Sequence, residues 1–94
     1  MSKRYREVLD EVETDDDRAE PTTFRWRGRR YRVVRVIGHW REDAGWWRRP
    51  DGEPVRIIQT DLWRVEARNG APRSRGIYEL VHRDGEWRLD KVWD

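Results

Sequence analysis

Apolar and polar side chains alternate with a period of two over much of the chain after residue 21. Phe24 and Trp26 alternate with arginines, Gly28-Arg29 supplies a turn, and Tyr31 resumes the apolar face. Such alternation is typical of a strand with one buried face, and two such runs joined by a glycine-containing turn predict a β-hairpin.

The alternation slips by one residue in the second strand of this hairpin. Tyr31 and Val33 share one parity, whereas Val34 and Val36 share the other. A β-bulge near Val33-Val34 would restore the order, because it adds one residue to one strand only. With that bulge, the arginines of the strand stay together on the outer face.

The pattern also predicts elements in the second half of the chain. Residues 38–54 contain three Gly, two Pro and no sustained period, so we expect a long loop there. Strands follow at residues 55–68, 77–82 and 87–93, with a tight turn at Asp84-Gly85. We expect Trp63 and Trp87 to be core rings that face each other across neighbouring strands.

The first twenty residues differ from the rest. Tyr5, Val8, Leu9 and Val12 fit one face of a helix, but a helix of about two turns is marginal alone. An aspartate run and Glu20-Pro21 follow it. We therefore predict a mostly disordered acidic arm at residues 1–20, dispensable for folding, before a small β domain at residues 21–94.

The predicted fold is all-β: a twisted antiparallel meander of five strands that curls toward an SH3-like or an OB-like barrel. Hydrophobic residues are only 35% of the chain and charged residues 43%, a composition that leans toward disorder. Seven Trp, three Tyr and one Phe reverse that tendency, because large rings bury much apolar area. The core should be aromatic.

Several classes of protein are disfavoured. The absence of cysteine excludes disulfides and thiolate zinc sites and fits a reducing compartment. No apolar stretch is long enough for a membrane helix, and no signal sequence is evident, so we expect a cytoplasmic protein, free or associated with the nucleoid.

The charge is unevenly distributed along the chain. Residues 1–20 carry four basic and eight acidic side chains, and the remainder carries 17 basic and 11 acidic ones. A basic body suits an anionic partner. Six arginines within the predicted hairpin are the candidate nucleic-acid-binding residues, through sequence-independent phosphate contacts: Arg25, Arg27, Arg29, Arg30, Arg32 and Arg35. The alternative is a solvated face paired with Glu66, Glu79 and Glu86.

Trp40, Trp46 and Trp47 in the expected loop are candidate partner-binding residues, because exposed rings stack on bases or fill protein pockets. The alternative is that they cap an open barrel end. Residues 59–63, QTDLW, resemble the short peptide by which bacterial polymerases bind the sliding clamp, but their position favours a strand.

Catalysis has little support. His39 and His82 are the only histidines, neither has a second residue at metal-ligand spacing, and no glycine-rich phosphate loop is present. We therefore expect no enzyme activity, catalytic residue, cofactor, metal or small-molecule substrate.

Three segments carry a family resemblance: GRRYRVVRVIGHWREDAGWW, DLWRVEARNG and RGIYELVHRDGEWRLDKVWD. Together, over residues 24–94, they resemble the small C-terminal domain of bacterial ImuB-type proteins, inactive Y-family polymerase relatives of the inducible mutagenesis complex. They also resemble the short free-standing proteins of uncharacterised function that share this domain. The resemblance implies a non-enzymatic interaction module that docks on translesion polymerase complex proteins. Binding of single-stranded DNA or a primer-template by the arginine hairpin and the loop tryptophans is the alternative.

Overall fold

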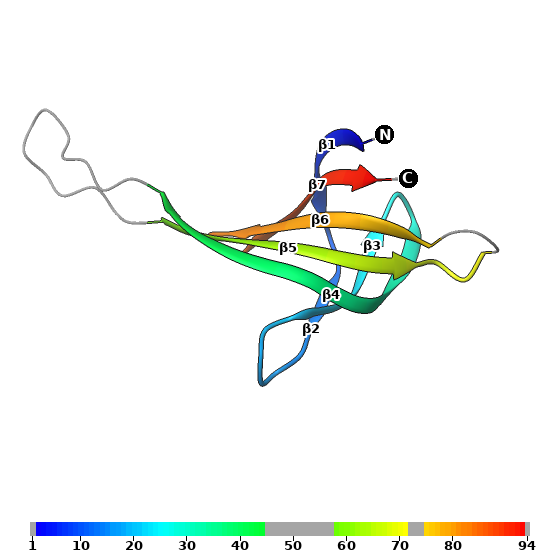
Figure 1. The fold of residues 1–94 in the computed structure, drawn as a ribbon, viewed down its shortest axis with the longest axis horizontal. Coiled ribbons are helices and arrows are strands. Elements are labelled where there is room, and N and C mark those ends of the chain that lie inside the picture. Colours follow the sequence, from blue (N-terminus) through cyan, green and yellow to red (C-terminus); the bar gives the residue numbers. More distant parts are fainter. Residues whose placement is uncertain (1, 45–57, 72–74, 94) are drawn as a thin grey trace, which may run out of the picture.

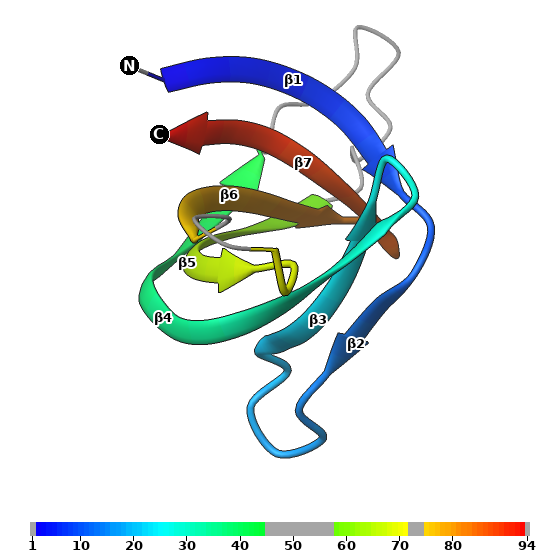
Figure 2. The same ribbon diagram turned by 90° about the vertical axis from the view of Figure 1, so that its right-hand side faces the viewer.

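The computed structural model describes residues 2–44, 58–71 and 75–93. These residues form one antiparallel sheet that curls into a half-barrel, with no helix in the described ranges (Figure 1, Figure 2). The all-β class predicted from the alternation is confirmed. The strands are β1 (Ser2–Leu9), β2 (Val12–Thr14), β3 (Pro21–Trp26), β4 (Arg29–Ala44), β5 (Ile58–Arg68), β6 (Gly76–Arg83) and β7 (Glu86–Trp93). Within these ranges, no helix could cross a membrane.

The strand order is β1-β7-β6-β5-β4-β3-β2, so strands β2 to β7 form a meander and β1 adds to the far edge beside β7. The two edge strands, β1 and β2, are therefore consecutive along the chain. The curl brings them together: Figure 2 shows the N-terminal segment passing from β7 across to β3. The N–H of Arg25 in β3 donates to the carbonyl of Glu11 at 2.9 Å, so the N-terminal segment ties both edges of the sheet.

The prediction of a mostly disordered arm at residues 1–20 is wrong, because strands β1 and β2 lie in this segment. Leu9 is only 5% exposed and belongs to the core, with Tyr5 and Val12 packed against it. The alternation is hidden by a bulge between Arg4 and Glu7 in β1 and by the break between β1 and β2. Without β1, the edge of β7 would lose its hydrogen-bonding partner, which favours the strand over a short isolated helix.

The core is aromatic, as expected. Phe24 and Tyr31 stack with their ring centroids 5.1 Å apart, and Tyr78 packs on both. Trp63 is buried, but the expected Trp63–Trp87 contact is wrong, because β6 lies between their strands. The buried hydrophobic residues are Leu9, Phe24, Tyr31, Trp63, Val65, Ala67, Tyr78, Leu80 and Leu89.

Strand β4 contains two bulges. Val33 pairs with Ala67 and Arg35 with Glu66, so Val34 is the extra residue, which confirms the predicted bulge near Val33-Val34. A second irregularity occurs between Val36 and Gly38. Each extra residue shifts the alternation, so Val34 and Ile37 are 40% exposed although they are apolar.

The prediction of a loop at residues 38–54 is wrong for its first part, residues 38–44. Strand β4 continues to Ala44, so Trp40 lies within a strand. The strand continues because polar residues in this part pair with residues of β5; Arg41, for example, lies opposite Asp61. Trp46 and Trp47 lie outside the described residues.

Both short hairpin turns have two residues in the left-handed region. Asp84 and Gly85 have φ of 50° and 79°, as predicted for that turn. In the first hairpin the corresponding residues are Arg27 and Gly28, at 51° and 77°, one position earlier than expected. Turns of this kind match the twist of the flanking strands and fix their register.

Candidate functional site

The arginine hairpin, formed by β3 and β4, is partly neutralised by the N-terminal segment. Arg30 donates to Glu11 and to Glu13, each at 3.0 Å, and Arg25 lies 3.5 Å from Glu11. These side chains are half or more exposed, and surface pairs of this kind contribute only about 0–1 kcal/mol each. The acidic residues thus form weak ion pairs with two of the predicted phosphate-binding arginines, Arg25 and Arg30, whose side chains stay half or more exposed.

Arg27 connects β1 to the hairpin turn. Its guanidinium carbon lies 4.9 Å from the ring centres of Tyr5 and Trp26, and its Nε donates to Glu7 at 3.2 Å. The indole N–H of Trp26 donates to the other oxygen of Glu7 at 2.9 Å. This indole hydrogen bond is the main cause that lowers the pKa of Glu7; burial opposes it and Arg27 adds to it. Arg27 therefore stabilises the closure between β1 and β3.

Arg35 has one of the partners expected from the sequence. It lies 3.8 Å from Glu66, which also pairs with Arg75 at 3.4 Å. Glu79 and Glu86, the other two expected partners, pair instead with Arg64 and Arg88. Of the six predicted arginines, Arg29 and Arg32 have no carboxylate within ion-pair distance in the described ranges.

Arg32 lines a surface hollow of about 610 Å³, here called the arginine hollow. In the sheet, Arg32 of β4 lies directly between Thr23 of β3 and Arg68 of β5. No carboxylate among the described residues pairs with Arg68 either. The hollow is lined by Thr23, Arg30, Arg32, Arg68, Asn69, Gly70 and Ala71.

Arg68 and Thr23 were missed as site residues by sequence reasoning. The sequence placed Arg68 at the end of a strand, but its position opposite Arg32 depends on the two bulges of β4. Register of this kind cannot be read from alternation alone.

A second feature of the outer sheet face is an apolar row along β4, formed by Val34, Ile37 and Trp40. Trp40 is 46% exposed, the other two 40%. The indole lies over Gly38, where a Cβ would come within 2.5 Å of the ring. Glycine at this position is therefore what allows the ring to lie flat along the strand.

Arg64 of β5 lies between two indoles beside this row. Its guanidinium carbon is 5.1 Å from the ring centre of Trp40 and 4.7 Å from that of Trp93. Glu79, which is only 7% exposed, lies 3.4 Å from the same guanidinium and balances its charge. A hollow of about 290 Å³ opens here, lined by Trp40, Arg41, Glu42, Leu62, Arg64 and Glu79.

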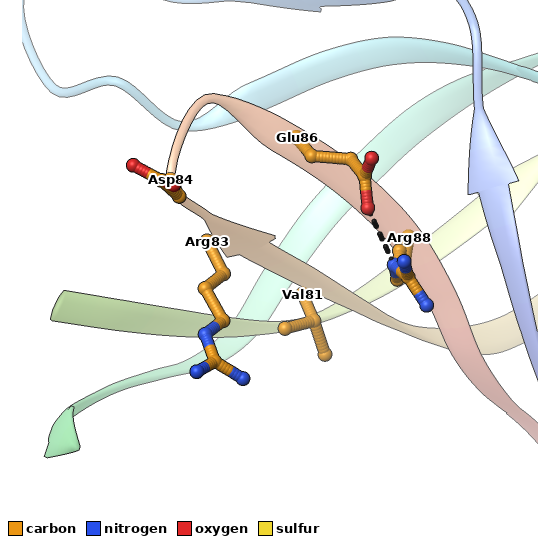
Figure 3. A pocket seen from close by; sticks show the side chains of 5 residues that line it. All are labelled: Val81, Arg83, Asp84, Glu86 and Arg88. Carbon is orange, nitrogen blue, oxygen red and sulfur yellow. Dashed lines mark hydrogen bonds and ion pairs between the residues drawn. The ribbon is translucent and has the colours of Figure 1, made fainter. Parts of the chain in front are cut away.

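The hairpin of β6 and β7 provides a third hollow, of about 500 Å³, here called the β6–β7 hollow (Figure 3). Like the arginine hollow, it is lined by arginines, here Arg83 and Arg88. Unlike the arginine hollow, it is also lined by two acidic residues, Asp84 and Glu86. Arg88 donates to Glu86 at 2.6 Å. Positive charge in this hollow is therefore compensated locally.

Both histidines stack on tryptophans. His39 lies parallel to Trp63 at 3.6 Å and donates to Asp61 at 3.0 Å, and His82 stacks on Trp87 at 4.4 Å. Burial raises the pKa of Asp61, but hydrogen bonds from His39 and from an arginine outweigh it, so the pKa lies below its usual value. No cluster of three metal-binding side chains occurs in the described part of the chain.

The clamp-like peptide at residues 59–63 lies within β5. Its residues pair with β4 on one side and, from Thr60 onward, with β6 on the other. Its backbone is therefore paired with neighbouring strands of the sheet, and the prediction of a strand is confirmed.

Comparisons with curated proteins and with solved structures found no match. A family described as "Domain of unknown function (DUF6504)" matches residues 2–94. The match includes the N-terminal segment, consistent with β1 and β2 being part of the same folded unit. The chain belongs to the DUF6504 family.

Proposed function

We propose that this domain is a non-enzymatic module that docks a protein partner on the outer face of β4. The observation that carries the proposal is the apolar row: three large apolar side chains, 40–46% exposed, on a strand inside the sheet. Exposed apolar side chains scattered singly are ordinary, but three of them on one strand, the last a tryptophan, are typical of a binding surface.

The surroundings of Trp40 resemble those of an interface hot spot. Arg35 and Arg41 have side chains 67% and 61% exposed along the same strand, and Arg64 lies beside the indole. Tryptophan and arginine are the residues most enriched at hot spots, where an apolar centre is surrounded by a polar rim. The hollow beside Trp40 gives a partner side chain a place to insert.

The partner class comes from the family resemblance. Residues 24–94 resemble the C-terminal domain of ImuB-type proteins, so the proposed partners are proteins of the translesion polymerase complex, such as the error-prone polymerase or its recombinase-like accessory protein. The proposed role is therefore in DNA-damage-induced mutagenesis. An apolar docking surface needs no catalytic residue or cofactor, in keeping with the interaction module expected from the sequence.

The test is capture of these proteins from cells exposed to DNA damage, with nuclease added, on immobilised domain. We compare the original chain with Trp40→Ala and with Val8→Ala, a matched control whose side chain is 52% exposed on β1. Loss of a hot-spot tryptophan should weaken binding by about 2 kcal/mol or more, roughly 30-fold, and Val8→Ala should not. Equal capture by Trp40→Ala and by the original chain would contradict the proposal.

A further inference from the structure

We infer that the arginine hollow binds the phosphate groups of a single-stranded nucleic acid backbone. This inference goes beyond the proposed protein docking and concerns other residues, so either proposal can fail alone. It also narrows the six hairpin arginines to the two that line the hollow, Arg30 and Arg32, and it adds Arg68, which belongs to another strand.

The first argument is the placement of like charges. Arg32 and Arg68 lie directly opposite each other on neighbouring strands, and no described carboxylate pairs with either. Like charges directly opposite each other in a sheet are destabilising. Positions that lower stability without local compensation are typical of functional sites, and an anion bound between the two guanidiniums would remove the repulsion.

The second argument is the contrast with the β6–β7 hollow. That hollow is of similar size and is lined by two arginines, against three in the arginine hollow, but Asp84 and Glu86 line it as well (Figure 3). In the arginine hollow, the carboxylates of Glu11 and Glu13 reach only Arg30, and none lines the hollow itself. The two hollows therefore differ in net charge although both are rich in arginine.

The third argument identifies the ligand class. The described lining residues are three arginines, Thr23, Asn69 and two small residues, and none of them is aromatic. Guanidiniums match phosphate oxygens in a fork geometry, but a base would find nothing to stack on. The hollow therefore suits a backbone phosphate and not a nucleobase, which predicts binding without sequence preference.

The sheet also favours a single strand over a duplex. The described residues contain no helix to enter a groove, and the hollow crosses three neighbouring strands, β3, β4 and β5. A duplex is stiff over about 150 base pairs, so bending it into a local hollow is costly, whereas a single strand follows the surface.

The experiment measures fluorescence polarisation of labelled oligothymidylate, and of a mixed-sequence strand, against salt concentration. The variant is Arg32→Gln with Arg68→Gln; the matched control is Arg83→Gln with Arg88→Gln, which removes the same charge from the β6–β7 hollow. We expect the test variant to lose about tenfold in affinity per guanidinium at low salt, and the control to keep binding. The slope of log K against log salt should flatten by about 1.4 for two lost phosphate contacts.

Three results would overturn the inference. The first is no binding by the original chain at about 50 mM salt, where phosphate contacts are strong. The second is an equal loss in the test and control variants, which would indicate net charge alone. The third is a melting temperature raised by millimolar inorganic phosphate, dependent on Arg32 and Arg68, without oligonucleotide binding; that would reassign the hollow to a small anion.

Discussion

Strand β1 should be essential for folding, and Leu9 offers the sharpest test. The side chain is 5% exposed in the core at the end of β1, opposite Trp87 of β7 and two residues before the chain crosses to β3. Replacing a buried leucine by alanine removes its transfer free energy and leaves a cavity, together about 2–5 kcal/mol. A domain of 94 residues has about 5–14 kcal/mol of total stability, so the loss is a large share of it.

The adjacent residue provides the control. Val8 lies on the same strand but is 52% exposed, so Val8→Ala should change the free energy of unfolding by less than about 0.5 kcal/mol. Urea denaturation followed by tryptophan fluorescence and far-ultraviolet circular dichroism measures both variants. In a melt, Leu9→Ala should lower the melting temperature by about 10 °C or more, since 1 kcal/mol corresponds to about 4–8 °C in a domain of this size.

Deletion of residues 2–14 is the more severe perturbation. It would expose Leu89 and Phe24, both fully buried, along the freed edges of β7 and β3. We expect no cooperative transition in the shortened chain. If Leu9→Ala melted like Val8→Ala, or if the shortened chain kept its cooperative melt within a few degrees, the N-terminal strands would be dispensable after all.

Three further predictions concern single side chains. The pKa of Glu7 in the folded chain is lowered from 4.5, so its contribution to stability is present above that value and is lost as the pH falls through the folded pKa. Urea denaturation should therefore show Glu7→Gln to be less stable than the original chain at pH 7 and equal to it in acid. Gly38→Ala should displace the Trp40 ring and shift its indole N–H resonance, with the other six indole signals unchanged. Glu11→Gln should strengthen oligonucleotide binding by freeing Arg30, and an unchanged affinity would show that the ion pair does not compete.

The sequence predicted the elements whose signals are local. The alternation around Phe24 and Tyr31, the turn at Asp84-Gly85 and the bulge at Val34 all depend on neighbouring residues, and the structure contains each of them. The end of β4 could not be predicted in this way. Its residues read as a loop because they are polar, and they form a strand because β5, far along the chain, supplies partners such as Asp61 for Arg41.

The candidate site was predictable only in part for the same reason. Alternation was enough to place Arg30 and Arg32 on the outer face, but not to bring Arg68 opposite Arg32. That position depends on the register between β4 and β5, which two bulges shift. The apolar row has the same origin, since each bulge turns one apolar residue, Val34 or Ile37, toward solvent.

The uneven charge distribution of the sequence acquires a different meaning in the fold. The acidic N-terminal residues are not a separate arm, because Glu7, Glu11 and Glu13 pair with Arg25, Arg27 and Arg30 of the arginine hairpin. Along β4 these ion pairs end at Arg30, so among the described residues of the hollow, Arg32 and Arg68 are the arginines without a carboxylate partner. It follows that removing the acidic segment cannot test whether it competes with an anionic ligand, since the same residues hold the sheet together. Only substitutions that preserve the strands, such as glutamate to glutamine, separate its electrostatic role from its structural one.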